Sequence, residues 1–428
     1  MFLAVYNIAF HPPSKFPGPL TRAAFAWPGL LGTCKGQYVS DVWDIHQKYG
    51  PVVRIAPDAV SFSTSGAWKG VNSCFLRMGK NKSRKTISVF QIKSTQFIFL
   101  VYSFPRLIRI TLANFVASND VDHARIRRIV SYGFSASALR AQDGMITSHI
   151  QTLMRELSAR ISTKTDIKKW FDILTFDIMS HLTFGESFSA LPTGELDPFT
   201  VDLFGKFKMY NLIYLSREYG WINSLFKLMM KLPSVAEQQR RYFEGTRLKV
   251  EKRMQTDNPD EHDFMRYILH NNHENAMDLT EIIGTTTVLV NGGGQEMAVC
   301  LSTTLYFMLK NPGWLKRSQN ELSADNGSST TCIEAAINEA MRLHPPAAGN
   351  FQRRTGDSGI FVDGHFVPPN TSVGVNQYAA FHSPANFHDP ERFAPERWLA
   401  SPPNEFFNDN TAAFQPFSMG PRNCIGKK

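Results

Sequence analysis

The sequence predicts a mainly α-helical fold with a small β-sheet near the N-terminus. Apolar residues recur at helical spacing through the middle of the chain, and Leu279–Leu309 is apolar on nearly all sides. Only Pro51–Phe62 and Ile360–Val375 combine β-branched residues with turn residues in the way that short strands do. Helices should therefore form most of the structure.

Composition excludes several classes of protein. The chain has 428 residues, of which 43% are hydrophobic and 19% charged, as in a globular protein and unlike a disordered, collagenous or coiled-coil one. Its cysteines show no CxxC motif or regular spacing, which argues against a disulfide framework or a zinc module and favours a reducing compartment. They are Cys34, Cys74, Cys300, Cys332 and Cys424.

The net charge of +9 comes from one segment of the chain. Between Ala59 and Asn119 there is no acidic residue but nine Lys and Arg residues, and subtracting these nine from 46 leaves 37 basic residues against 37 acidic ones. The rest of the chain is neutral overall, so a nucleic-acid-binding role is not expected. The apolar run Phe97–Phe104 within this segment is too short to span a bilayer of roughly 30 Å.

The N-terminus predicts a short apolar segment and a linker over residues 1–20, followed by a single domain over 21–428. Met1–Phe10 contains Asn7 and has neither a basic start nor a cleavage site, so it is no complete signal peptide or transmembrane helix. The following HPPSKFPGP is broken by prolines, which predicts a stiff linker that no helix or strand crosses. A loose membrane contact stays open.

Periodicity gives the elements in order. A helix at Val42–Tyr49 precedes a hairpin with its turn at Pro57 and Asp58. Apolar residues from Ile146 to Leu157 predict the next helix, and short strands are expected within Ile360–Val375. Further helices are predicted at Trp170–Phe184, Val235–Thr256, Asp263–Leu269, Leu279–Leu309 and Ile333–Leu343.

The helix predicted at Leu279–Leu309 has three consecutive glycines at its centre. At about 31 residues it far exceeds the mean helix of roughly 11–12, so it should cross the interior. Each of Gly292, Gly293 and Gly294 costs up to about 1 kcal/mol relative to Ala. One glycine would indicate tight helix packing, whereas three together favour a flat, bulky group against the backbone, with Gly293 as a cofactor contact.

The strongest chemical signal is the sequence FSMGPRNCIG at Phe417–Gly426. Cys424 lies between two glycines and two residues after Arg422, in a loop that begins with Phe417. A thiolate ligand to haem iron needs this combination: no bulky side chain near the macrocycle, backbone N–H groups directed at sulfur, and a cation for a propionate. The alternative, a small buried hydrophobic cysteine, does not explain the fixed spacing of five residues.

Two further motifs give the chain a resemblance to a known family. Glu339 and Arg342 lie at i and i+3 of a predicted helix, and FAPERW at Phe393–Trp398 follows about 55 residues later. With the cysteine loop, they resemble the cytochrome P450 family, and more narrowly its fungal secondary-metabolism members. The resemblance implies the P450 fold and a buried structural network of Glu339, Arg342 and Arg397.

The resemblance also implies a cofactor, partners and a location. The cofactor is haem b with Cys424 as iron ligand, His123, Arg127, Phe417 and Arg422 as further contacts, and Arg353 or its neighbour Arg354 at a propionate. Expected partners are an NADPH-dependent P450 reductase and a hydrophobic small-molecule substrate, with no nucleic acid. The expected location is the cytosolic face of the endoplasmic reticulum membrane.

At several positions the sequence departs from the family pattern, and these departures leave more than one function open. The family's acid and threonine, which deliver protons during oxygen activation, are replaced by Gln295 and Glu296 as the expected catalytic pair. Residues 77–115 form an anomalous basic and apolar insert, and the sequence stops just after the cysteine loop, which predicts that the C-terminal helix and sheet region are lacking. Three functions follow: a monooxygenase, a haem-binding remnant with little or no activity, or a haem-thiolate isomerase or dehydratase.

Overall fold

The computed structural model of this chain divides into two compact units. The first unit holds described residues up to 73 and from 299 to 423, and the second holds those between 114 and 298 together with 424–427. The described residues are 2–73, 114–116, 118–197, 200–201, 232–256, 262–272, 277–324, 330–349 and 352–427. Most of the predicted insert 77–115 therefore lies outside them. The prediction of a single domain over 21–428 stays a prediction.

The first unit contains the sheets. Strands β1 (Val52–Ala56) and β2 (Ala59–Phe62) are antiparallel and joined by a turn at residues 57 and 58, as the sequence predicts. β2 pairs in parallel with β6 (Ser372–Val375), which pairs with β3 (Arg353–Arg354). β4 (Ile360–Val362) and β5 (His365–Val367) form a separate hairpin. The strands β3 and β6, which complete this sheet, thus lie more than 290 residues further along the chain than β2.

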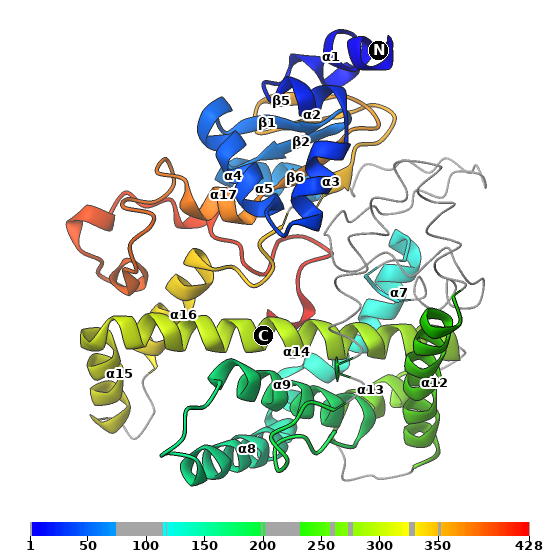
Figure 1. The fold of residues 1–428 in the computed structure, drawn as a ribbon, viewed down its shortest axis with the longest axis vertical. Coiled ribbons are helices and arrows are strands. Elements are labelled where there is room, and N and C mark those ends of the chain that lie inside the picture. The colour runs from blue at the N-terminus through cyan, green and yellow to red at the C-terminus, as the bar shows by residue number, and fades with distance from the viewer. Residues whose placement is uncertain are drawn as a thin grey trace. The chain divides into compact units, whose positions relative to one another are not determined.

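Several short helices of the first unit lie beside these strands (Figure 1). The helix predicted at Val42–Tyr49 is present as α4, which begins four residues earlier, and the one predicted at Ile333–Leu343 is present as α16. The α-helices are α1 (Phe2–Ala9), α2 (Leu20–Ala24), α3 (Trp27–Cys34), α4 (Tyr38–Tyr49), α5 (Ser65–Ser73), α15 (Pro312–Ala324), α16 (Thr331–Leu343) and α17 (Gln377–His382). The 3₁₀ helices are η1 (Pro12–Lys15), η4 (Pro395–Trp398), η5 (Asn404–Phe406) and η6 (Thr411–Ala413).

The proline-rich segment contains one short helical turn, although no helix or strand crosses the whole segment. Its residues Pro12–Lys15 form a 3₁₀ turn, which proline tolerates because its missing N–H falls in the first turn. Phe16 is buried in the core beside the sheet, and the carbonyl oxygen of Pro17 accepts a hydrogen bond from the N–H of Arg54 at 2.7 Å. The segment is therefore packed into the first unit.

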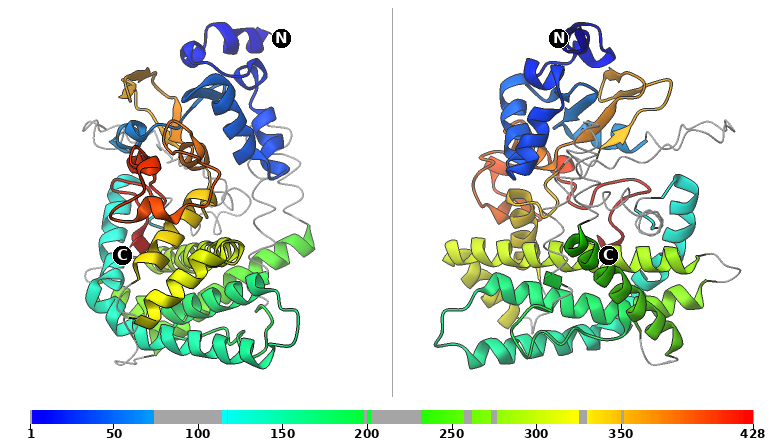
Figure 2. Two further views of the ribbon diagram at one scale, coloured as in Figure 1. Left: turned by 90° about the vertical axis from the view of Figure 1, so that its left-hand side faces the viewer. Right: turned by 45° about the vertical axis from the view of Figure 1, so that its right-hand side comes forward.

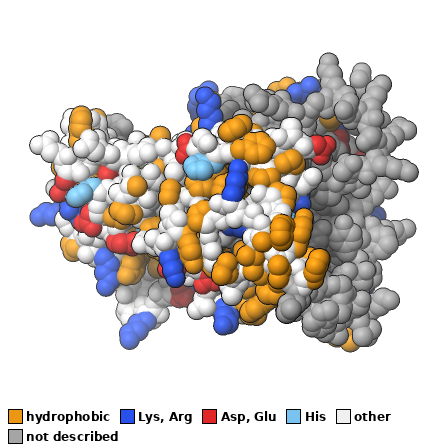
Figure 3. All heavy atoms as spheres, turned by 90° about the horizontal axis from the view of Figure 1, so that it is seen from above, with side chains coloured by type: hydrophobic (Ala, Val, Ile, Leu, Met, Phe, Trp, Pro, Cys, Tyr) orange, Lys and Arg blue, Asp and Glu red, His pale blue; other side chains and the backbone are white. Residues whose placement is uncertain are grey.

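Helix α1 is fixed by polar contacts and exposes apolar side chains. The Asn7 amide donates to the Ala24 carbonyl oxygen at 2.8 Å, and the buried Arg54 guanidinium donates to the Asn7 carbonyl oxygen at 2.8 Å. Phe2 and Leu3 are 91% and 68% exposed. Figure 3 views the molecule from the side that α1 occupies in Figure 1 and shows hydrophobic side chains gathered on that face.

The second unit is helical. Helix α9 begins at the N-cap Asp166, whose carboxylate accepts from the Lys169 N–H, and ends at Gly185, which has the positive φ of 70° that glycine adopts without strain. Its helices are α7 (Asp120–Val130), η2 (Ser131–Phe134), α8 (Ala136–Ala159), α9 (Ile167–Phe184), α12 (Pro233–Gln255), α13 (Phe264–His270), the first part of α14 (Leu279–Lys310), and η7 (Ile425–Lys427). Figure 2 shows α8 and α9 beside each other.

The predicted helices of the second unit are confirmed to within three residues, apart from α8, which starts earlier than its apolar stripe. Helix α14 has 32 residues, and its N-terminal half packs into a core with Phe176 and Phe264. The described helices include none that is both long and apolar enough to cross a membrane. The fold is mainly α with small sheets, as predicted.

Candidate functional site

Cys424 sits at the start of η7 in the second unit. The backbone N–H of Gly426 donates a hydrogen bond to its sulfur, and its side chain is accessible to solvent. Although Cys424 is exposed, the protein atoms around it partly desolvate the thiol and raise its pKa, and the Glu296 carboxyl acts in the same direction. The Gly426 hydrogen bond and the Arg127 guanidinium act in the opposite direction. The sulfur thus has a backbone N–H donor and a nearby cation, and the assignment of Cys424 as a thiolate ligand stays a prediction.

Helix α7 carries the predicted His123 and Arg127 four residues apart. Asn119 caps the helix by accepting from the Asp122 N–H at 3.0 Å, so both residues fall inside it. His123 is buried, and its Nδ1 donates to the carbonyl oxygen of Phe115. Burial lowers the pKa of Arg127, and Cys424 raises it. Of these two residues, Arg127 is the one whose charge acts on Cys424.

Helix α14 brings Glu296 into electrostatic contact with Cys424. Burial raises the pKa of the Glu296 carboxyl to about 7, so it exchanges protons near neutral pH. Gly292 lies four residues earlier on the same helix face, and apart from its own stretch of helix no atom of the described residues lies within 4 Å of the position a Cβ would occupy there. Gln295 is partly buried and lies about 100° around the helix axis from Glu296.

Two of the three glycines, Gly293 and Gly294, allow α14 to approach a neighbouring helix closely. A Cβ on Gly293 would overlap Sδ of Met179, and a Cβ on Gly294 would lie 2.7 Å from Cε1 of Phe176. Both contacts are with α9. The Cβ sides of Gly293 and Gly294 therefore serve close helix packing, whereas that of Gly292 is open, and the assignment of Gly293 as a cofactor contact stays a prediction.

Strand β3 shows which of the two neighbours, Arg353 and Arg354, faces the interior. Successive side chains of a strand point to opposite faces, and here Arg353 is buried while Arg354 pairs with Asp58 at 3.3 Å at the surface. The Arg353 guanidinium donates to Oδ1 of Asn72 at 3.5 Å. Arg353 is thus the inward-facing residue, as the resemblance favours.

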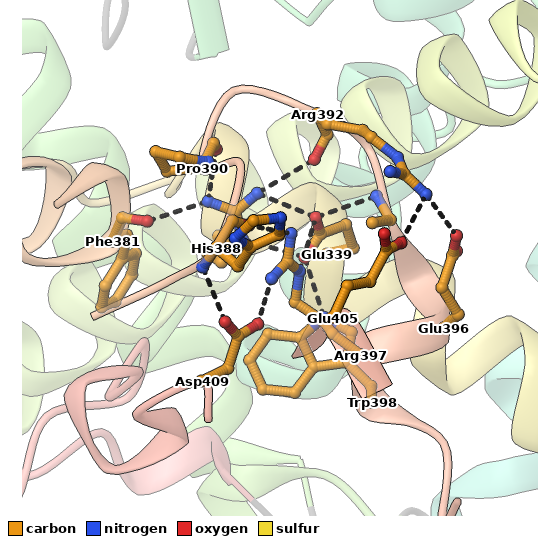
Figure 4. A network of polar contacts seen from close by, with 12 residues as sticks. Glu339, Phe381, His388, Pro390, Arg392, Glu396, Arg397, Trp398, Glu405 and Asp409 are labelled. Atoms are coloured by element: carbon orange, nitrogen blue, oxygen red, sulfur yellow. Dashed lines mark hydrogen bonds and ion pairs between the residues drawn. The ribbon is translucent and has the colours of Figure 1, made fainter. Parts of the chain in front are cut away.

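The predicted network of Glu339, Arg342 and Arg397 is present and fully buried (Figure 4). Glu339 accepts from Arg342 at 2.8 and 2.9 Å, from Arg397 Nε at 3.2 Å and from Trp398 Nε1 at 2.9 Å. Arg397 also contacts Asp409. The remaining donors of Arg342 reach the carbonyl oxygens of Phe381, Pro390 and Arg392. With its charges paired in this way, the network ties α16 to η4 and to the chain that follows.

The first-unit part of the cysteine loop is held by backbone geometry. Gly420 has a φ of 78°, and a Cβ there would lie 3.2 Å from Cβ of Asn72. Phe417 and Arg422 are partly buried. Asn72 therefore lies against both the loop and Arg353, and no motif in the sequence singled it out.

The residues around Cys424 in the second unit are compatible with an anionic sulfur ligand that binds a flat metal complex. A thiolate needs N–H donors and positive charge, which Gly426 and Arg127 supply. A planar group against α14 needs a position without a side chain, which Gly292 supplies. The chemistry of this donor set fits haem.

Comparison with known proteins agrees with this chemistry. The model of the family described as Cytochrome P450 matches residues 17–428. Cytochrome P450 monooxygenase astA of Talaromyces wortmannii is 34% identical over 99% of this chain and 84% of its own length. Cytochrome P450 monooxygenases aclL of Aspergillus oryzae and stcF of Emericella nidulans are 34% and 32% identical, over 99% of this chain and 85% and 86% of their own lengths. The chain belongs to the cytochrome P450 family.

Proposed function

We propose that this protein is a haem-thiolate monooxygenase that inserts one oxygen atom of O₂ into a hydrophobic small molecule in fungal secondary metabolism. The observation that carries the proposal is Cys424, with the Gly426 N–H directed at its sulfur and the Arg127 charge nearby. Relatives over nearly the whole chain are named monooxygenases. When bound, haem b supplies the activation of O₂.

The chain's own residues have separate roles in holding the cofactor. Cys424 is proposed as the iron ligand, with the Gly426 N–H supporting negative charge on sulfur. Cationic or imidazole groups are proposed to hold the carboxylates of haem b, and Phe417 to border the loop. These groups are His123, Arg127, Arg353 and Arg422.

Glu296 and Gln295 are proposed to control proton supply. A carboxyl group whose pKa is about 7 can both give and take a proton at physiological pH. Glu296 occupies the position where the family has a threonine, so a longer acid replaces a hydroxyl there. We propose that Glu296 transfers protons from water. Gln295 stands where the family has an acid, and its amide carries no charge.

The electron donor and the location are proposed from the family together with the surface of α1. We propose that electrons come from NADPH through a P450 reductase. The exposed Phe2 and Leu3, on a helix fixed by Asn7 and Arg54, support association with the cytosolic face of the endoplasmic reticulum membrane.

The replaced threonine favours a second candidate function. A haem-thiolate isomerase or dehydratase rearranges a substrate without a proton relay for O₂. Gln295 and Glu296 are compatible with that chemistry, because Glu296 can act as a general acid or base on the substrate itself. Oxygen consumption with substrate present separates the two functions: the isomerase consumes none.

The test of the proposal is spectroscopic. The purified protein is reduced under CO, and the shifted absorption band of a haem thiolate is expected in the wild type and absent in Cys424→Ala. Cys34→Ala, Cys300→Ala and Cys332→Ala are matched controls and should keep the band. Haem bound without the band indicates the inactive remnant, and retention of the band in Cys424→Ala overturns the ligand assignment.

A further inference from the structure

Two histidines face each other between α8 and α9 in the second unit. Nε2 of His149 lies 3.0 Å from Nδ1 of His181, and their rings are at 89° to each other. Both side chains are partly exposed, so the pair is reached from solvent. The P450 reaction as proposed above uses neither residue.

The pair lies beside the buried carboxyl group of Asp177, and its surroundings favour a neutral imidazole at His149. Burial lowers the pKa of His149, the neighbouring His181 lowers it further, and Asp177 raises it. Asp177 lies one turn before His181 and is buried, and its carboxylate accepts from the backbone N–H groups of Ala190 and Leu191 at 3.0 and 2.9 Å. A neutral imidazole has the lone pair that a metal ion binds, and the carboxylate's charge stabilises a cation nearby.

We propose that His149 and His181 form a two-histidine site for a divalent transition-metal ion, with Zn²⁺ as the best fit. Zinc–nitrogen bonds of about 2.0–2.1 Å at tetrahedral angles separate two ligand nitrogens by roughly 3.3 Å, close to the spacing already present here. Imidazole ligands suit zinc, copper and nickel rather than magnesium or calcium.

The proton balance of binding is simple. The two facing nitrogens share one proton in the hydrogen bond, and the metal ion takes its place. That proton moves to the outer nitrogen of the same ring, through water, so both histidines stay neutral and donate a lone pair. The described residues bring no third His, Cys, Asp or Glu into a metal-binding group, so water molecules complete the coordination.

A metal ion at this site would link α8 to α9, the helix that packs against Gly293 and Gly294 of α14. Met179 and Phe176, on the same helix as His181, are in van der Waals contact with Gly293 and Gly294. Joining α8 to α9 through the metal should therefore stabilise the folded second unit, because the metal binds the folded pair and not two separated histidines.

The experiment measures Zn²⁺ binding to the full chain, purified without a polyhistidine tag, by isothermal titration calorimetry. We expect His149→Asn and His181→Asn each to weaken the affinity at least tenfold. His365→Asn is the matched control, since His365 is exposed and its Nδ1 donates to the Asp363 carbonyl oxygen. Mg²⁺ should not bind there. Wild-type affinity in His149→Asn overturns the proposal.

A second measurement needs no variant. Diethyl pyrocarbonate modifies accessible neutral imidazoles, and mass spectrometry of peptides locates each modified histidine. Zn²⁺ should slow the modification of His149 and His181 severalfold and leave that of His365 unchanged. Equal protection of all three histidines, or of none, contradicts a site at this pair.

Discussion

Glu339 and Arg397 are joined by a 3.2 Å hydrogen bond although 58 residues separate them, and neither side chain is exposed. Arg397 also contacts the buried Asp409, while Glu339 is shared with Arg342. Buried charges are tolerated only when their partners are in place. Each charged residue of this network therefore needs the others, and the intact network stabilises the first unit.

Arg397→Ala should destabilise the protein by about 3–5 kcal/mol, because it leaves the carboxylate of Asp409 buried without its guanidinium partner. Arg392→Ala is the matched control: it removes pairs with Glu396 and Glu405, but Arg392 is 44% exposed and the cost should be below about 1 kcal/mol. Urea unfolding gives both values. Equal losses would contradict a structural network.

Gly293→Ala should destabilise the protein by roughly 1–3 kcal/mol, since the added Cβ overlaps Met179. Gly292→Ala should leave stability unchanged or raise it by up to about 1 kcal/mol, because its Cβ position is open and alanine favours a helix. Thermal unfolding of both variants checks this. The further change Met179→Ala should recover part of the loss in Gly293→Ala, and no recovery would mean that the clash lies elsewhere.

Glu296→Gln should alter how stability depends on pH. The ordinary pKa of Glu is 4.5 and burial raises that of Glu296 to about 7, so between these values the unfolded chain ionises first and the wild type loses stability as pH rises. Above pH 7 the accumulated loss reaches about 3 kcal/mol. The free energy of unfolding of the variant minus that of the wild type should therefore grow between pH 5 and pH 8. A constant difference would show that Glu296 is not desolvated.

If the protein turns over with O₂, most NADPH-derived electrons should appear as hydrogen peroxide. The family's hydroxyl is replaced by Glu296, and general acid contributions of roughly 10²–10⁴-fold depend on correct placement of the proton donor. Gln295→Glu combined with Glu296→Thr restores the family pair and should raise product formed per electron. Gln295→Glu alone is the control and should raise it less. Measuring peroxide and oxygenated product in all three proteins decides this, and unchanged coupling would mean that Glu296 has no part in proton delivery.

The sequence predicted the secondary structure well where the signal is local. Helix α9 and the hairpin of β1 and β2 follow from spacing and turn residues within a few positions of each other. The 3₁₀ turn at Pro12–Lys15 and its packing against the sheet were missed, because the core that buries Phe16 is assembled from residues more than 30 positions away.

The sequence by itself determined the family and the paired motif of Glu339 and Arg397, and it predicted Cys424 as the ligand, since fixed spacings of unusual residues are readable without coordinates. Only the tertiary structure decided that Gly292 and not Gly293 has an open side, that Arg353 faces inward, and that His149 meets His181. These outcomes depend on which distant side chain occupies the neighbouring space. Packing, and with it the desolvation that raises the pKa of Glu296, is a property of the assembled chain and not of any local pattern.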